Sequence, residues 1–374
     1  MKIFHCDHCD NLVFFENTHC VNCGHVLAFL PDLAEMGSLE AAGNDQWVSP
    51  LPIASGHTYR LCDNYRDAKV CNWAVRQSDG HRLCESCRLT RTIPGLNVPG
   101  HLEGWYKLEV AKRRLVYTLM GLGLPLANRD DDPEQGLAFE FLADSQPGAP
   151  SVLTGHANGV ITINVAEADD AEREKRRHNL GEPYRTLLGH MRHEVGHYYW
   201  DRLIARTDRL YAFRQLFGDE REDYGQALQR HYAQGPPGDW QNRFVSAYAS
   251  AHAWEDWAES WAHYLHMTDT LETAAACGVS IRPRRADEPS LAKVPASAGT
   301  PSGSFDRLID SWYPLTYVLN NLNRGLGQPD GYPFVLSPPV VDKLRFVHDT
   351  VNSWMINAQT PAQTQMRTRT QTSR

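Results

Sequence analysis

The sequence predicts an α+β protein in two parts, a cysteine-rich region followed by a mainly helical domain with a small sheet. Three observations lead to this prediction. Eight of the nine cysteines fall within the first 87 residues, in two groups of four. Two runs rich in apolar and β-branched residues follow at 136–144 and 151–169. Most of the chain after them has the apolar spacing of amphipathic helices.

The composition indicates a soluble globular chain. Its 374 residues are 42% hydrophobic and 22% charged, enough for one large domain or for two to three ordinary ones. The net charge of -8 argues against general binding of nucleic acid, because such binding needs a basic surface. No signal peptide is recognisable, and no stretch approaches the roughly eighteen apolar residues of a membrane span. We therefore expect a cytoplasmic protein whose reduced cysteines serve metals or catalysis.

The first cysteine group has the spacing of a zinc ribbon. Cys6, Cys9, Cys20 and Cys23 form two C-x2-C knuckles separated by a hairpin-length spacer. Each knuckle presents two thiolates to one ion, and Gly24 gives the second turn the backbone freedom that it needs. So small a unit buries too little apolar surface to fold alone, and we expect the metal to supply its folding energy.

A second group of four cysteines has one tight knuckle, at its end. Its members are Cys62, Cys71, Cys84 and Cys87. We expect a second structural zinc site, with His81 as an alternative to one cysteine; a group of buried free thiols is the competing interpretation. Sites with four thiolates have no open coordination position, so both groups are expected to be structural. Cys277 stands apart and is expected to pack as a small apolar residue.

Breaker residues and apolar periodicity set the order of the elements. The cysteine-rich region covers 1–95, and its middle, 34–56, is expected to be a loop-rich connector. The second domain covers 101–357, with a mobile Pro/Ala/Ser-rich insertion near 281–304, and 358–374 is expected to be a disordered tail. The expected helices cover residues 105–124 (amphipathic, with basic residues opposite its apolar face), 182–207, 246–269, 312–327 and 340–354.

The helical stretch 188–203 contains His193-Glu194-Val195-Gly196-His197, the pattern H-E-x-x-H. On a helix, positions i and i+4 share one face, so both imidazoles can reach one zinc ion. Glu194 would lie beside that ion and accept a proton from water, whose pKa zinc lowers towards neutrality. The pattern is short enough to arise by chance, so its meaning depends on whether the chain completes the site.

A catalytic zinc ion takes three protein ligands plus water, so one more ligand is needed. Glu255 and Glu259 share one helical face in the pattern E-x-x-A-E-x-x-A, whose small alanines allow close packing on a neighbouring helix. We expect Glu255 to bind the metal and Glu259 to accept a hydrogen bond from a ligand histidine. The alternative, a solvated acidic face, is disfavoured by three tryptophans in the same stretch, which indicate burial on more than one side.

Other residues are weaker candidates for the same site. Asp223 or Glu220 could be the third ligand, although their segment has the pattern of a charged helical surface. His190 could face the site but is better interpreted as a packed histidine, and His263 and His266 are expected to be structural.

The two patterns together resemble the gluzincin arrangement of zincin metallopeptidases. The chain is similar to a bacterial family of zinc-binding metallopeptidases with an N-terminal zinc ribbon. The stretches that carry this similarity are CDHC…CVNCG, GVITINVAEAD, HEVGHYYWD, HAWEDWAESWAHYLH and residues 312–337. The resemblance implies a zincin-like fold, with His193, His197 and Glu255 as zinc ligands and Glu194 as general base. Glu259 stands where many gluzincins have aspartate, a departure from the pattern.

We therefore expect a zinc metallopeptidase with one catalytic and two structural zinc ions, acting on a peptide or protein and on no membrane. Glu194 would take a proton from water and return it to the leaving amine, and Tyr317 or Tyr332 would donate to the oxyanion. The strand 159–165 could hold an extended substrate if it is an edge strand beside the active-site helix, or could be an ordinary sheet strand.

Two other functions compete with hydrolysis. One is a non-catalytic zinc-binding module for protein interaction, and the other is a zinc-ribbon protein that binds nucleic acid, which the acidic charge disfavours. Glu194 favours the enzyme over the interaction module, because a purely structural site gains nothing from a general base at this position.

Overall fold

The computed structural model describes residues 1–144, 152–180, 185–281 and 303–371. Its contacts divide the chain into two units. The N-terminal unit holds Lys2–Tyr117 and Leu126–Arg176, and the C-terminal unit holds Met1, Thr118–Pro125 and Arg177–Arg374. This division follows packing, so it groups residues 126–176 with the cysteine-rich region. The domain boundaries at 1–95 and 101–357 remain a prediction. The expected mixture of helix and sheet is confirmed.

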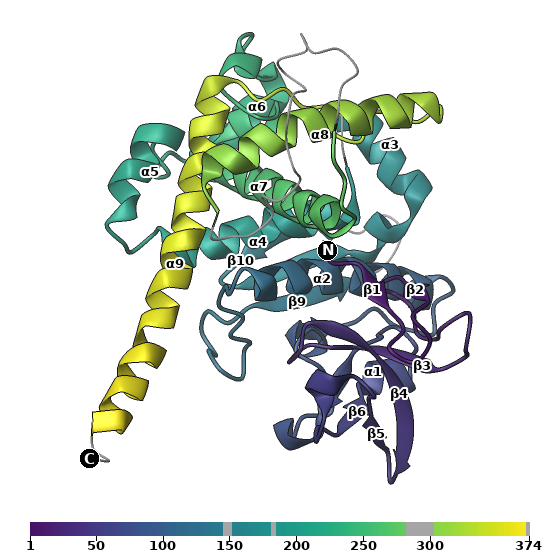
Figure 1. Ribbon diagram of the computed structural model, residues 1–374. Coiled ribbons are helices and arrows are strands. Elements are labelled where there is room, and N and C mark those ends of the chain that lie inside the picture. The colour runs from purple at the N-terminus through teal and green to yellow at the C-terminus, as the bar shows by residue number, and fades with distance from the viewer. Residues whose placement is uncertain (145–151, 181–184, 282–302, 372–374) are drawn as a thin grey trace. The chain divides into compact units, whose positions relative to one another are not determined.

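A curved, five-stranded antiparallel sheet belongs to the N-terminal unit, and its strands β3 to β6 are labelled in Figure 1. Its order is β3-β4-β5-β6-β7, and a bridge between Phe29 and Trp73 brings β3 back to the beginning of β7. Phe15, Phe29 and Trp73 pack against one another inside this curve. The strands are β3 (Val26–Leu30), β4 (Glu35–Gly43), β5 (Gln46–Val48), β6 (Tyr59–Leu61) and β7 (Ala74–Arg76). A separate two-stranded sheet precedes them, in which β1 (Phe4–His5) pairs with β2 (Leu12–Val13). The short helix α1 (Asp63–Arg66) follows β6.

The connector expected at 34–56 is corrected, because β4 and β5 lie within it. Its Gly, Ala and Ser residues have weak intrinsic strand preference, which is why the sequence suggests loops. Pairing with β3 on one side and β6 on the other supplies the missing stabilisation, and Asn44 and Asp45, both at positive φ, form the turn between β4 and β5.

A second sheet in the same unit has the order β10-β11-β9-β8. Its strands are β8 (Thr90–Thr92), β9 (Ala138–Leu142), β10 (Gly155–Ala157) and β11 (Val160–Asn164). β11 is parallel to β9 and antiparallel to β10, so both of its edges are paired. The edge-strand hypothesis for 159–165 is therefore wrong. Asn158 and Gly159, both at positive φ, fold β10 back onto β11 and make β10 the edge.

Helix α2 (His101–Gly121) buries charges that the sequence assigns to its exposed face. Lys112 is fully buried and its Nζ lies 2.8 Å from Oε2 of Glu109, which is also fully buried. Arg113 is buried as well and donates to the carbonyl of Val70. The prediction that the basic residues of this helix lie on its exposed face is therefore wrong for Lys112 and Arg113. Each buried cation has a polar partner, and a long basic side chain is accommodated inside a protein under that condition.

The C-terminal unit is helical. It contains α4 (Leu187–Leu203), α5 (Arg209–Phe217), α6 (Tyr224–Gln234), α7 (Ala253–Ala276), α8 (Phe305–Gly325) and α9 (Pro338–Gln371), and it receives the end of α3 (Asp170–Leu180). In Figure 1, α9 is the long yellow helix. Among the described helices, none combines the length and the apolar character that crossing a membrane would require.

Helices α4 and α7 pack closely because of small residues at their crossing. A Cβ added to Gly196 would lie 3.0 Å from Cα of Ala258 and 3.2 Å from Cβ of Trp261. Nε1 of Trp257 donates to the carbonyl of Gly196 at 2.8 Å, which fixes the two helices at this point. The close packing expected from the alanines of α7 is thus confirmed, and the glycine of H-E-V-G-H makes it possible.

The end of the chain differs from expectation. α9 continues to Gln371, so the backbone of 358–371 is helical where the sequence predicts a disordered tail. The helix begins with buried Val340, Leu344 and Val347 at helical spacing. Once such a segment is formed, adding further turns costs little because each new residue gains a backbone hydrogen bond. Most of the insertion expected near 281–304 lies outside the described residues.

Candidate metal centre

Helix α4 supplies the first part of the candidate site. The Thr186 hydroxyl caps its first turn by accepting from the backbone N–H of Gly189 at 3.0 Å. Seven to eleven residues further along, His193, Glu194 and His197 are buried, with 9%, 8% and 4% of each residue exposed. The i, i+4 spacing places both imidazoles on one face, as the sequence predicts.

Helix α7 supplies the second part. His252, in an extended conformation, ends the preceding 3-10 turn and caps α7 by accepting from the N–H of Trp254 at 3.0 Å. Glu255 follows in the first turn and is fully buried. On the same helix, the carboxylate of Asp256 pairs with Nζ of Lys343 in α9 at 2.6 Å, so α7 is held on its other side as well.

Three ligand atoms from the two helices meet at one point. Nε2 of His193 lies 3.2 Å from Nε2 of His197 and 2.9 Å from Oε2 of Glu255, and Nε2 of His197 lies 3.5 Å from the same oxygen. Ligands around a tetrahedral zinc ion are about 3.3 Å apart, because zinc–nitrogen and zinc–oxygen bonds are roughly 2.0–2.2 Å long. The observed separations therefore match the edges of a zinc coordination shell.

The arrangement of lone pairs also fits a cation. Nδ1 of His193 lies 2.7 Å from Oε1 of Glu259, so Nδ1 is the donor and Nε2 presents its lone pair. That lone pair faces a second imidazole nitrogen and a carboxylate oxygen. Oε2 of Glu255 is buried and has no hydrogen-bond partner among the described residues. Converging acceptors are stabilised by a positive ion between them, so these residues fit a metal.

Glu259 occupies the position that the sequence predicts for a residue supporting a ligand. One oxygen accepts from His193, and the other accepts from the Ser246 hydroxyl at 2.6 Å. Burial raises the pKa of Glu259, but interactions led by the hydrogen bond from His193 outweigh it and lower the pKa to about 2. Glu259 is therefore an anion that fixes both the tautomer and the ring orientation of His193.

Glu194, next to His193 in α4, is buried and interacts electrostatically with His193, His197 and Glu255. Burial raises its pKa above the ordinary value, while the neighbouring His193 and His197 lower it in part. A carboxylate with a raised pKa accepts a proton more readily near neutral pH.

Two tyrosines near the ligand atoms, Tyr224 and Tyr248, are not predicted from the sequence. The Tyr224 hydroxyl, on α6, donates to Oε1 of Glu255 at 2.5 Å, so it holds the oxygen that does not face the imidazoles. The ring of Tyr248 lies 5.9 Å from that of His193. Burial raises the pKa of Tyr248, and the charges of Glu255 and Glu194 raise it further, so its hydroxyl stays protonated. The break at His252 separates Tyr248 from α7, whereas the sequence predicts one helix over 246–269.

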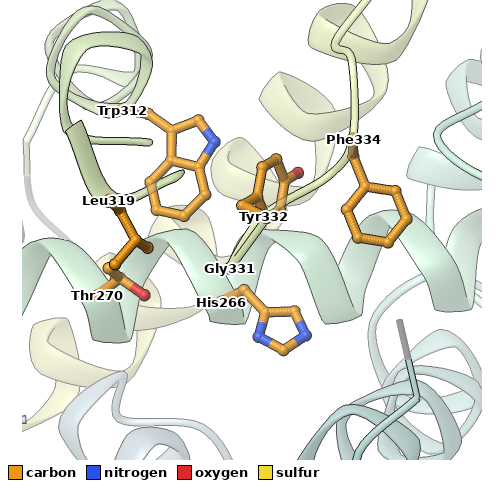
Figure 2. Close-up of a pocket in the computed structure, with 7 residues that line it drawn as sticks. All are labelled: His266, Thr270, Trp312, Leu319, Gly331, Tyr332 and Phe334. Atoms are coloured by element: carbon orange, nitrogen blue, oxygen red, sulfur yellow. The ribbon is translucent and has the colours of Figure 1, made fainter. Parts of the chain in front are cut away.

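The two tyrosines suggested from the sequence as oxyanion donors differ in their surroundings. Tyr317 is 58% exposed, and the Tyr332 hydroxyl bonds Nδ1 of His263 at 2.7 Å. Tyr332, Phe334, Trp312 and His266 are among the residues that line a small cavity of about 100 Å³. Figure 2 shows Tyr332 between Trp312 and Phe334. The Tyr332 hydroxyl is thus engaged with His263, and its role as an oxyanion donor stays a prediction.

The other candidate ligands also have different partners. Glu220 pairs with Arg214 at 2.9 Å, and Asp223 caps α6 by accepting from the N–H of Gln226 at 2.9 Å. His266 contacts Arg192 at 2.5 Å, which agrees with the structural role expected of it. His190 lies outside the group of three ligand atoms.

The two cysteine groups each gather around one point in the N-terminal unit. Within each group the sulfurs lie within 4.8 Å of one another. The Sγ pairs Cys6–Cys23 and Cys9–Cys20 are 3.6 Å apart, close to the roughly 3.8 Å between thiolates on one tetrahedral zinc ion. In the second group, whose cysteines are all buried, the Cys71–Cys84 pair is 3.8 Å apart.

The structure tests what the sequence predicts for His81 and for Cys277. All four cysteines of the second group are present in the cluster, and His81 is exposed and 3.7 Å from Asp79, so it replaces none of them. Cys277 is exposed, which corrects its predicted packing in the core. It follows the last residue of α7, where the helix has left the packed interior.

Fold and site together define a mixed helix-and-sheet protein with two four-cysteine clusters and a buried His–His–Glu cluster. A family model described as "Putative zinc-binding metallo-peptidase" matches residues 101–350, and one described as "zinc-ribbon domain" matches residues 3–98. The chain belongs to this zinc-binding metallopeptidase family, with an N-terminal zinc ribbon.

Relatives of nearly the same length occur in mycobacteria. The chain is 46% identical over 353 residues to "Uncharacterized protein Rv2568c" of Mycobacterium tuberculosis, covering 94% of this chain and 96% of the relative. The same identity and coverage hold for "Uncharacterized protein Mb2598c" of Mycobacterium bovis. No solved structure matches the chain.

Proposed function

We propose that the chain is a zinc-dependent metallopeptidase with a gluzincin-type site on a zincin-like domain. His193, His197 and Glu255 would hold the zinc ion, and Glu194 would be the general base. One observation carries the proposal: three ligand atoms from α4 and α7 converge at one point, and the buried Glu194 follows the first ligand histidine in α4. The family membership supports the same class of activity.

The chemistry divides between the metal and the chain. Zinc bound by this triad would polarise a carbonyl and lower the pKa of a water molecule. Glu194 accepts the proton of the attacking water and delivers it to the nitrogen of the leaving amine, so that the amide bond breaks without a charged amide leaving group. Glu259 and Tyr224 keep the ligand side chains in position through their hydrogen bonds to His193 and Glu255.

Tyr248 is the candidate donor to the oxyanion. It lies beside His193, and its raised pKa keeps the hydroxyl protonated. The ring of His231, on α6, lies 6.0 Å from that of Tyr248, and burial lowers its pKa so that it is neutral at physiological pH. The neutral hydroxyl of Tyr248 would stabilise the negative charge that develops on the carbonyl oxygen of the substrate.

Substitutions at the two glutamates of α7 should separate metal ligand from positioning residue. Glu255→Ala removes a coordinating oxygen and is expected to empty the site. Glu259→Ala removes only the hydrogen bond to His193 and is expected to weaken zinc binding by about 10- to 100-fold. Competition with a chromogenic chelator measures both affinities. A larger loss at Glu259 than at Glu255 would reverse the two assignments.

Peptide hydrolysis is tested with a mixed peptide library and mass-spectrometric identification of new termini. The full chain should produce cleavage products, lose this activity when a strong chelator strips the His–His–Glu site, and regain it on addition of zinc. Products that persist without metal, or a zinc-loaded chain that cleaves no peptide of the library, would contradict the proposal and favour a non-catalytic zinc-binding module.

A further inference from the structure

The zinc-ribbon region contains two histidines that the four-cysteine cluster does not use. His8 lies inside the first knuckle, CDHC, and His25 follows the second knuckle, CVNCG. One ring nitrogen of each histidine and one carboxylate oxygen of Glu40 lie within 4.8 Å of one another. His8 and Glu40 are exposed, and His25 is half-buried, so this group opens to solvent.

The backbone fixes all three positions. Asp7 ties the first knuckle to β4, because its carboxylate accepts from the N–H of Ser38 at 2.6 Å and from the Ser49 hydroxyl at 2.9 Å. The carbonyl of His25 accepts from the N–H of Cys20 at 2.9 Å, which fixes it to the second knuckle.

The strand register then brings in the carboxylate. Val26 of β3 pairs with Leu39 of β4, so His25 and Glu40 are the next residues across this antiparallel pair. Opposite residues on antiparallel strands have neighbouring side chains. The cluster is therefore set by the fold of the ribbon and does not depend on a chance approach of surface side chains.

The two imidazole rings lie face to face, and one ring nitrogen is without a partner in the described part of the chain. The rings are stacked, with centroids 3.7 Å apart and an angle of 27° between their planes. Nδ1 of His25 is buried and has no hydrogen-bond partner among the described residues. This buried ring nitrogen is an unsatisfied polar atom, which a bound ion could satisfy.

We propose that His8, His25 and Glu40 bind a divalent transition-metal ion at a site separate from the four-cysteine zinc. Imidazole and carboxylate ligands suit zinc, nickel or copper. Three protein ligands leave coordination positions open to water, and the site is exposed, so its ion should exchange readily. This distinguishes it from the closed thiolate clusters, which retain their zinc.

Nickel titration of the full chain tests the proposal. The zinc-loaded protein is first dialysed against a weak chelator, and Ni²⁺ binding is then followed by calorimetry and native mass spectrometry. We expect one saturable Ni²⁺ per chain without loss of the resident zinc. Glu40→Gln and His8→Ala should each weaken this binding by more than about tenfold, since a lost ligand costs more than a lost supporting hydrogen bond.

The control is His81→Ala, which removes an exposed histidine of the same unit outside the cluster and should leave the titration unchanged. If His8→Ala also loses ribbon zinc, Glu40→Gln decides, because Glu40 lies on β4 and outside both knuckles. No saturable Ni²⁺ site, or one that both variants retain, would mean adventitious binding only and would overturn the proposal.

Discussion

Glu194→Gln is expected to lower peptide hydrolysis by about 10²- to 10⁴-fold, the usual cost of losing a general base. Glutamine keeps the volume of the side chain but cannot accept the proton of the attacking water. Because Glu194 is not among the three residues whose ligand atoms converge, the variant should bind zinc like the wild type and melt at a similar temperature. Initial rates on a cleaved peptide, zinc content and thermal unfolding are the three measurements.

The matched control is Glu222→Gln, the same change at an exposed glutamate of the C-terminal unit, which should leave hydrolysis unchanged. Wild-type activity in Glu194→Gln would locate the chemistry elsewhere. Loss of zinc would make Glu194 a ligand and the proposed mechanism would fail. A variant that binds substrate but does not cleave it could be used to capture one.

Cys84→Ser is expected to unfold the N-terminal unit. Cys84 is fully buried, its Sγ lies 3.8 Å from that of Cys71, and its backbone N–H donates to the sulfur of Cys62. Structural zinc contributes on the order of 10 kcal/mol to the folding of small sites, which is comparable with the roughly 5–15 kcal/mol stability of a whole domain. Removing one thiolate should therefore release one zinc ion and expose the unit to proteolysis.

Limited proteolysis and zinc analysis measure this effect, and the chain provides a control in the exposed Cys277. Cys277→Ser removes a thiol without touching either cluster and should change neither zinc content nor the cleavage pattern. If Cys84→Ser matches the wild type in both, the second cysteine cluster holds no structural metal.

The parts of the site that depend on local spacing could be predicted from the sequence. The i, i+4 histidines and the two glutamates of α7 follow from helical periodicity alone. Their convergence across 62 residues, from His193 to Glu255, could be inferred because small residues and tryptophans mark a helix packed on another helix. The thiolate knuckles are equally local, since each C-x2-C turn places two sulfurs at one ion.

Features set by tertiary contacts could not be predicted in this way. The position of Tyr248 depends on the break at His252, and nothing in the local composition of 246–269 indicates one. The burial of Lys112 depends on its contacts with Glu109 and with Thr90, which lies outside α2. The pairing of β11 with β10 depends on the turn at Asn158 and Gly159. In each case a partner elsewhere in the fold outweighs the preference of the local sequence.

Zinc stoichiometry tests the central claim most directly. The two four-cysteine clusters and the buried His193–His197–Glu255 cluster are the three sites expected to retain zinc, so native mass spectrometry of the full chain, dialysed against a weak chelator to clear the exposed His8–His25–Glu40 site, should show three zinc ions. His197→Ala removes one ligand of the His–His–Glu cluster and should leave the two ions held by thiolates. A wild-type chain with two zinc ions, unchanged in His197→Ala, would contradict the claim that α4 and α7 build a metal centre.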